Sequence, residues 1–207
     1  MDKFSRGEAL SFGWQKTKEN LPFFLGLIAV AGVIYYLPLI IADRFKDSAK
    51  LLYVVISLAS VVVNWIFQLG MIRIALKFCD VRKAKISDLF AESRLLFKFI
   101  GATFLYLLIV MGGLILLIVP GIIWSVKFSL YPYLIVDKGL GPIESLKKSA
   151  EITKGSIWDL MVFGFIAFLI ILLGVLALLV GLFAAVPTVM LAWAFVYRRL
   201  LAAPASA

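Results

Sequence analysis

The sequence of 207 residues contains no histidine and a single cysteine, Cys79. Without histidine the chain lacks the commonest general base and the commonest metal ligand. One cysteine cannot form an internal disulfide. Acidic residues are also few, with 12 Asp and Glu against 21 Lys and Arg, and the chain carries no P-loop, dinucleotide fingerprint or nucleophile–base pair. We therefore expect no catalytic activity, no metal and no cofactor.

Apolar residues, in contrast, make up 63% of the chain. A water-soluble domain carries roughly 45–50%, so most of the surplus must face lipid. The apolar runs are about 20 residues long, which is the length of a helix that crosses a hydrocarbon core of about 30 Å. They do not alternate in polarity as the strands of a membrane barrel do. The composition therefore predicts an all-α integral membrane protein.

Six transmembrane helices are expected, arranged as three hairpins. Val119-Pro120-Gly121 separates the third run from the fourth, because proline lacks the helical donor and glycine tolerates a turn. The last apolar stretch, 157–201, is about twice as long as a bilayer is thick, so it must fold back once, with Pro187 in the first turn of the final span. The predicted spans are residues 21–42, 51–72, 99–118, 121–136, 160–180 and 186–201.

Polar blocks at 1–20, 77–98 and 142–155 precede the three hairpins. Each block is basic and amphipathic, and we expect each to form a helix that lies in the membrane interface. In the first block, Trp14 and Thr17 are spaced so that they share the face that meets the membrane.

The first and third blocks also resemble each other, with Glu-Ala-Leu at 8–10 and Glu-Ser-Leu at 144–146. We interpret the chain as one membrane domain, with possible repeat units at 1–78, 79–141 and 142–207.

The positive charge is distributed unevenly along the chain. With six spans, all but four of the 21 Lys and Arg residues fall on one side of the membrane. Loops rich in Lys and Arg stay in the cytoplasm, so both termini are predicted to be cytoplasmic in a multi-pass protein of the inner (plasma) membrane. The net charge of +9 is then juxtamembrane charge, and we do not expect nucleic acid as a partner.

Lys127 lies inside the fourth predicted span. A lysine near the middle of a membrane costs about 2.5–3.5 kcal/mol on insertion scales. It could form part of a substrate- or lipid-binding centre with Asn64, Gln68 and Tyr131. Alternatively, its long side chain could reach the interface, while Asn64 and Gln68 make structural hydrogen bonds between helices.

The basic blocks also offer contacts to anionic lipid headgroups or to a protein partner. A cation near the surface contributes about 1 kcal/mol to binding an anionic membrane. The same charges could instead serve topology alone. The chain could also form a homo-oligomer or join a membrane complex. The candidate contact residues are Lys147, Lys148, Lys154, Arg82 and Lys83.

A family resemblance rests on Pro-Gly-Ile-Ile at 120–123, on the opening segment 8–20 and on a set of spaced residues, namely Gly121, Gly141, Leu146, Ser149, Lys154 and Gly155. In these features the chain resembles the membrane domain attached to some glycerophosphoryl diester phosphodiesterases and its stand-alone YciC-like inner-membrane relatives. It departs from them at Thr17, where an aromatic residue is expected. The resemblance implies a membrane topology without the catalytic domain.

Two functions remain open from the sequence. The chain could be a non-catalytic bundle that handles a lipid or a small solute in or across the membrane. Alternatively, it could be an accessory or scaffold subunit that docks a cytoplasmic partner or anionic lipid through its basic amphipathic helices.

Overall fold

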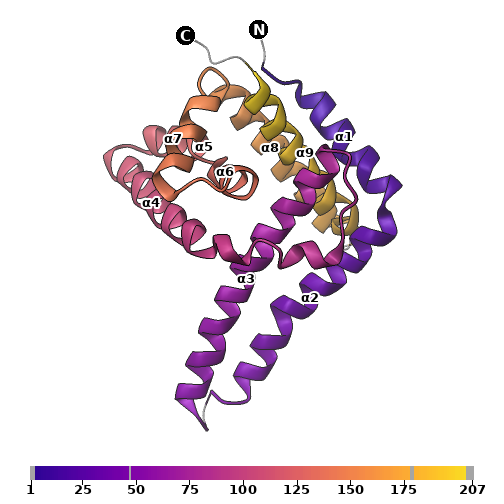
Figure 1. The fold of residues 1–207 in the computed structure, drawn as a ribbon, viewed down its shortest axis with the longest axis vertical. Helices are drawn as coiled ribbons and strands as arrows, with labels where there is room; N and C mark the ends of the chain where they lie inside the picture. Colours follow the sequence, from indigo (N-terminus) through magenta and orange to yellow (C-terminus); the bar gives the residue numbers. More distant parts are fainter. Residues whose placement is uncertain (1–2, 47, 178–179, 204–207) are drawn as a thin grey trace.

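The computed structural model of the protein describes residues 3–46, 48–177 and 180–203, and within them all regular structure is helical. The chain forms α-helices and two short 3-10 turns (Figure 1). In order they are α1 (Arg6–Glu19), α2 (Leu21–Asp43), α3 (Lys50–Cys79), η1 (Ile86–Leu89), η2 (Ser93–Leu95), α4 (Leu96–Leu116), α5 (Ile118–Lys127), α6 (Tyr131–Lys138), α7 (Pro142–Ile152), α8 (Ile157–Leu176) and α9 (Leu182–Ala202).

Six helical segments of the described chain are long and apolar enough to cross a membrane, which confirms the predicted multi-pass membrane class. They are Leu21–Asp43, Lys50–Cys79, Ile86–Leu116, Ile118–Lys138, Ile157–Leu176 and Leu182–Ala202.

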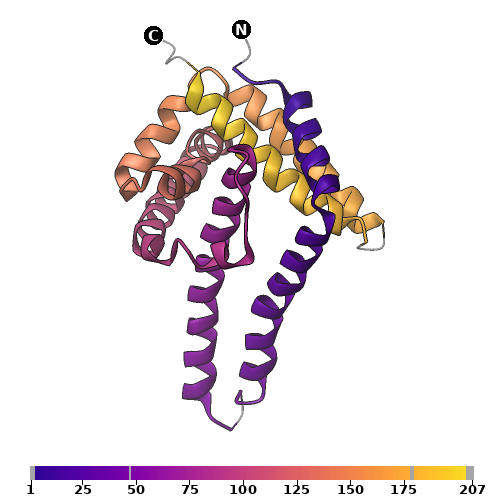
Figure 2. The same ribbon diagram turned by 45° about the vertical axis from the view of Figure 1, so that its right-hand side comes forward.

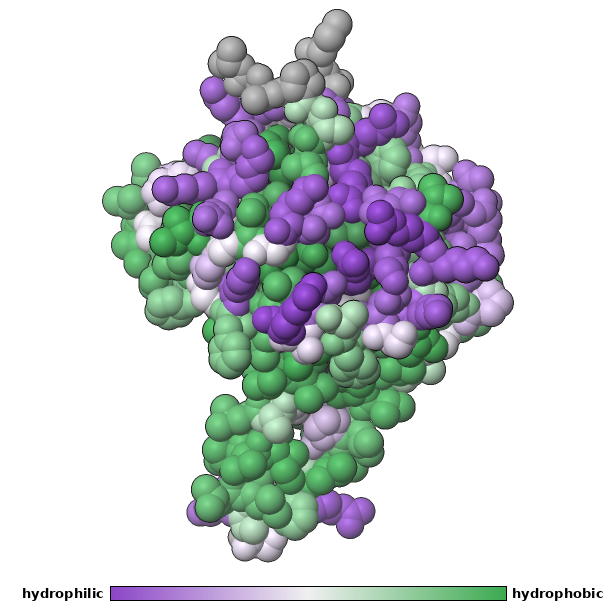
Figure 3. Space-filling model, viewed as in Figure 1, coloured by the Kyte–Doolittle hydropathy of each residue, from purple (hydrophilic) through white to green (hydrophobic). Residues whose placement is uncertain are grey.

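The molecule has two regions of different character. Most helices form a body, from which the end of α2 and the start of α3 project together as a long arm (Figures 1 and 2). Large apolar side chains of the arm are exposed, as at Tyr36, Leu51 and Leu58. Figure 3 shows the arm as hydrophobic up to its tip, while hydrophilic side chains gather over the front of the body. The described ends of the chain lie together at the end of the molecule opposite the tip of the arm.

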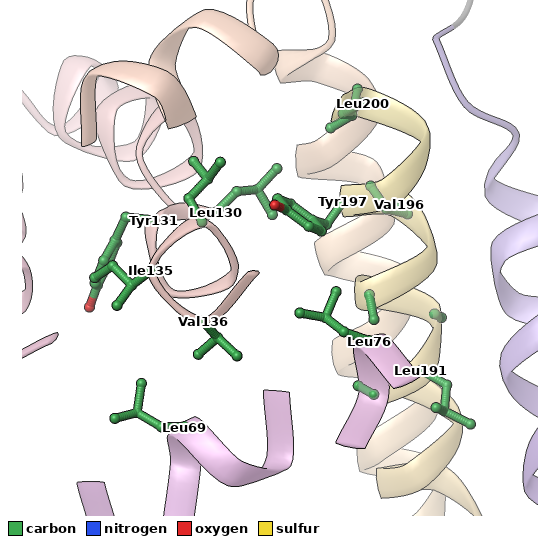
Figure 4. Packing of buried hydrophobic residues seen from close by; sticks show 14 of the residues in the cluster. Leu69, Leu76, Leu130, Tyr131, Ile135, Val136, Leu191, Val196, Tyr197 and Leu200 are labelled. Carbon is green, nitrogen blue, oxygen red and sulfur yellow. The ribbon is translucent and has the colours of Figure 1, made fainter. Parts of the chain in front are cut away.

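The core of the body is formed where α3, α6 and α9 meet (Figure 4). Leu69 and Leu76 of α3, Ile135 of α6 and Leu191 of α9 are almost fully buried. Tyr197 is also fully buried, and its ring stacks on that of Tyr133 with 5.3 Å between centroids. These contacts hold the ends of three helices from distant parts of the sequence in one cluster.

The first and third polar blocks form helices, α1 and α7. Ser5 begins α1 by accepting a hydrogen bond from the Glu8 N–H, and Glu144 accepts one from the Gly141 N–H at the start of α7. Such capping satisfies N–H groups that a helix end leaves free.

The buried face of α1 consists of Ala9, Gly13 and Thr17, and at corresponding places α7 buries Ser145, Ser149 and Thr153. The predicted membrane-facing side of α1 was wrong at Thr17, which is buried and packs against α9, whereas Trp14 is 47% exposed.

The second polar block does not form the predicted amphipathic helix. Residues 80–95 form only the 3-10 turns η1 and η2, which pack against α3. Lys77 and Asp88 pair at 2.7 Å, and Arg73 and Glu92 pair at 3.3 Å. These ion pairs, together with the close approach of the Leu89 backbone to Gly70, hold the segment in a path that a continuous helix could not follow.

The predicted break at Pro120 and Gly121 lies three residues too late. The turn after α4 is made at Leu117, whose backbone is extended, and Pro120 is the third residue of α5. Gly121 instead lets α5 approach Gly113 of α4, where a Cβ on Gly113 would lie 2.9 Å from the Gly121 Cα. Pro187 likewise lies inside α9, beyond its first turn.

Candidate functional site

Lys127 is the last residue of α5, and its side chain is half-buried. Its ammonium nitrogen lies 5.7 Å from the centre of the Phe128 ring, a distance at which a cation is attracted to an aromatic face. The carbonyl of Lys127 accepts hydrogen bonds from the hydroxyls of Ser149, at 3.1 Å, and Thr153, at 2.9 Å. The main chain of Lys127 therefore anchors α7.

Ser149 bridges the gap between α5 and α6. Its Oγ accepts a hydrogen bond from the N–H of Leu130, at 3.1 Å, in addition to donating to the Lys127 carbonyl. Both partners belong to helix ends, which lack the usual intrahelical bonds. The buried hydroxyls of α7 thus stabilise the break between α5 and α6.

The four residues predicted to form a binding centre are not brought together. The Asn64 amide donates to the Ser60 carbonyl of its own helix at 2.9 Å, and Gln68 is exposed. The Tyr131 hydroxyl lies 2.8 Å from Oγ1 of Thr103. No hydrogen bond or ion pair joins Lys127 to Asn64, Gln68 or Tyr131 in the part of the chain that the structure describes.

The basic residues of α7 lie at the surface of the body. Lys147 and Lys154 are exposed, and Lys148 pairs with Glu151 at 2.6 Å. The carbonyl of Lys154 accepts a hydrogen bond from the Lys3 ammonium at 2.7 Å. The hydrophilic face of Figure 3 is therefore available for contact with a charged surface or partner.

Arg82 and Lys83 line a pocket of about 430 Å³ between the α1–α2 junction and the loop that follows α3. Lys16 and Glu19 form one wall, and Phe23 and Phe78 are part of the lining. Glu19 accepts hydrogen bonds from Lys16, at 2.7 Å, and from Gln15, and these bonds lower the pKa of its carboxyl group. Sequence reasoning identified the two cations of the loop but missed Lys16 and the aromatic lining.

The remaining motif residues have structural positions. Gly141 directly precedes α7, and Gly155 adopts a φ of 81° in the turn before α8, a conformation that favours glycine. Pro187 is buried in α9 next to Thr188, whose hydroxyl lies 3.3 Å from that of Thr17.

A partly buried polar network at the ends of α3, α6 and α9 was missed. Arg198 contacts Asp137 and Asp80, each at 2.8 Å, and the Tyr197 hydroxyl donates to Asp137 at 2.9 Å. The sequence held a signal for it, because the three charged residues lie near the cytoplasmic ends of predicted spans, Asp80 and Asp137 after a span and Arg198 within the last four residues of one. The network ties three helices together and belongs to the architecture of the body.

A second, apolar pocket of about 420 Å³ lies between the start of α5 and the start of α8. Val119 and Ile122 line one side, and Ile157 and Trp158 line the other. The turn between α4 and α5 therefore lies beside the first residues of α8. Across the described ranges, no group of three or more Cys, Asp or Glu side chains could hold a metal ion.

Comparisons with known proteins find distant relatives. The uncharacterized protein Mb2590 of Mycobacterium bovis and the uncharacterized protein MT2637 of Mycobacterium tuberculosis are each 23% identical to the chain over 224 residues. The match covers 95% of this chain and 69% of each relative. No family model and no solved structure matches the chain.

Proposed function

We propose that the protein is a non-catalytic, multi-pass protein of the inner membrane that handles an anionic lipid, or a small solute, in or across the membrane. The observation that carries the proposal is that exposed cations such as Arg82, Lys83 and Lys147 belong to the body, where hydrophilic side chains gather beside helices with exposed apolar surface (Figure 3). Anionic headgroups attract such cations, by about 1 kcal/mol each near the surface. The contacts favour lipid binding at the surface over a polar path through the membrane, because no hydrogen bond or ion pair joins Lys127 to Asn64 or Gln68 in the described chain.

The proposed topology has both termini on the cytoplasmic side. Support comes from the excess of Lys and Arg beside the predicted spans and from the arm, whose tip lies far from the described ends of the chain (Figure 1). In this topology the α2–α3 and α8–α9 pairs each cross the membrane and return.

The α4–α5 pair has a different path. The end of α9 carries the Arg198 network, and α8 packs antiparallel to α9, with the Phe163 ring 4.9 Å from that of Trp193. The start of α8 is thus level with the network, and the start of α5 lies against it. We propose that α4 and α5 stay on the side of the membrane that carries the network and do not cross, which still leaves the termini on one side. Three crossing pairs are the alternative.

Native mass spectrometry of the protein, purified in a mild detergent, tests the lipid proposal. We expect retained phospholipids with anionic headgroups, enriched over zwitterionic ones relative to the membrane extract. Retention in proportion to the extract, or no retention, would count against the proposal.

An accessory or scaffold role is the second candidate, favoured by the exposed lysines of α7. Under this proposal, the Lys147→Glu/Lys148→Glu variant loses a co-purifying cytoplasmic protein while its bound lipid is unchanged. Unchanged co-purification argues against docking through α7. The resemblance to the membrane domain of glycerophosphoryl diester phosphodiesterases remains a proposal, and it supports the topology rather than an activity.

A further inference from the structure

The pocket lined by Arg82 and Lys83 combines charge with an apolar lining. The aromatic rings of Phe23 and Phe78 contact each other, with 5.8 Å between centroids. Phe23 lies in the first turn of α2, and Phe78 lies in the last turn of α3. The pocket therefore lies where two apolar helices end and the charged surface begins, which is the depth at which a phospholipid headgroup joins its acyl chains.

The cations of the pocket are not equivalent. Lys16 is paired with Glu19 at 2.7 Å, so these two charges compensate each other. The side chains of Arg82 and Lys83 make no hydrogen bond or ion pair with any residue that the structure describes, and both are exposed. An anion in the pocket would therefore meet a net positive charge, which Arg82 and Lys83 supply.

Val81, also in the pocket lining, has a strained backbone. Its φ is 56°, and it is the one non-glycine residue with a positive φ among those described. It follows the end of α3, where the N–H of Arg82 reaches back to the Lys77 carbonyl at 2.8 Å. Glycine is usual at such a position, and a β-branched residue is unfavourable there. The Val81 side chain is 91% exposed, so packing within the described chain does not compensate the strain.

The backbone of Val81 is strained, and its apolar side chain is exposed next to two unpaired cations. This combination indicates a ligand with an anionic group and an apolar part. We propose that the pocket binds the phosphate of an anionic phospholipid, with Arg82 and Lys83 on the headgroup and Val81, Phe23 and Phe78 against the acyl chains. The inference rests on the proposed lipid-handling function and assigns it to one site.

Binding of short-chain phospholipids to the detergent-purified protein tests this site. The probes are dihexanoyl phosphatidylglycerol, dihexanoyl phosphatidylcholine and inorganic phosphate. We expect the anionic lipid to bind most tightly, and its affinity to fall roughly tenfold or more in Arg82→Gln/Lys83→Gln. The matched control Lys85→Gln/Arg94→Gln removes two exposed cations that follow in the same polar block but do not line the pocket, and it should change the affinity less than about twofold.

Val81→Gly separates binding from folding. Glycine relieves the strain, so the melting temperature should be unchanged or higher, while the affinity for the anionic lipid should fall several-fold. A charge-only surface would bind the lipid equally well in this variant. Binding as tight in Val81→Gly as in the natural protein would overturn the role of Val81 and the lipid assignment with it.

The remaining measurements distinguish a phospholipid from soluble phosphate as the source of the bound phosphate group. Inorganic phosphate that competes as strongly as the lipid would identify a soluble phosphate site and overturn the lipid. An equal loss of affinity in the Lys85→Gln/Arg94→Gln control would reduce the site to general surface charge. If native mass spectrometry finds anionic lipid while Arg82→Gln/Lys83→Gln binds normally, the proposed function stands and this pocket fails. If no anionic lipid is retained at all, both fail.

Discussion

The α2–α3 and α4–α5 pairs are both apolar, yet they relate to the body in opposite ways. The arm formed by α2 and α3 projects into open space, and residues such as Leu51 and Leu58 face outward (Figure 2). The α4–α5 pair lies against α7 and against the start of α8. Helix α5 has 10 residues, or about 15 Å, which is half of a hydrocarbon core. Apolar composition therefore counts the membrane helices without giving the direction in which each one runs.

The largest expected difference between the pairs is in access from outside the cell. Arg44→Cys lies at the tip of the arm, and Leu117→Cys lies at the turn between α4 and α5. In a Cys79→Ser background, an impermeant maleimide should label Arg44→Cys in intact cells and should not label Leu117→Cys. Lys147→Cys is the cytoplasmic control and should be labelled only after permeabilisation.

Labelling of Leu117→Cys as complete as that of Arg44→Cys would show instead that the α4–α5 pair crosses the membrane. The natural Cys79 is a poor reporter of sidedness, because its side chain is partly buried.

The second prediction concerns the close packing of α4 against α5. A Cβ on Gly113 would lie 2.7 Å from the Trp124 ring and 2.9 Å from the Gly121 Cα, whereas one on Gly112 meets nothing within 4 Å. Gly113→Leu should therefore lower the free energy of unfolding by about 3 kcal/mol, while the adjacent Gly112→Leu should be nearly neutral. Thermal unfolding in detergent measures both variants. Equal effects at the two positions would show that α4 and α5 do not pack as described.

A third, smaller difference concerns hydroxyl groups, which bond between helices at Ser149 and Thr153 but only within one helix in the arm. Ser149→Ala with Thr153→Val removes the bonds to the Lys127 carbonyl and to the Leu130 N–H, and we expect a loss of about 2 kcal/mol. Ser57 of the arm bonds only to the Tyr53 carbonyl in its own helix, so Ser57→Ala should have almost no effect. Faster proteolysis near 128–130 in the double variant would accompany the loss if α7 holds this break together. A double variant as stable and as protease-resistant as the natural protein would refute that role.

The sequence was informative about the helices and less so about their contacts. Runs of about 20 apolar residues predicted all six candidate membrane helices, because length and hydropathy are local properties. The prediction of a helix over 77–98 was wrong. Leu89 and Leu96, like Phe90 and Phe97, have the seven-residue spacing of an amphipathic helix. Contacts with α3 such as the Lys77–Asp88 ion pair determine the path of the chain instead. The Arg198 network joins residues up to 118 positions apart, and no local pattern indicates that distance. The end of α5 at Lys127 likewise depends on the Ser149 hydroxyl, which comes more than 20 residues later in the sequence.

The smallest expected effect is that of replacing Lys127, whose ammonium group and backbone carbonyl have different roles. The sequence singled out its ammonium group, whereas the structure uses its carbonyl, which any residue supplies. Lys127→Leu should therefore change the free energy of unfolding by no more than about 0.5 kcal/mol. Lys98→Leu is the control, because the Lys98 ammonium donates to the Gly139 carbonyl at 2.7 Å and its loss should cost about 1 kcal/mol. If Lys127→Leu is much the more destabilising of the two, or if it abolishes lipid binding, the charge of Lys127 has a role that these contacts do not include, and a polar centre in the membrane regains its support.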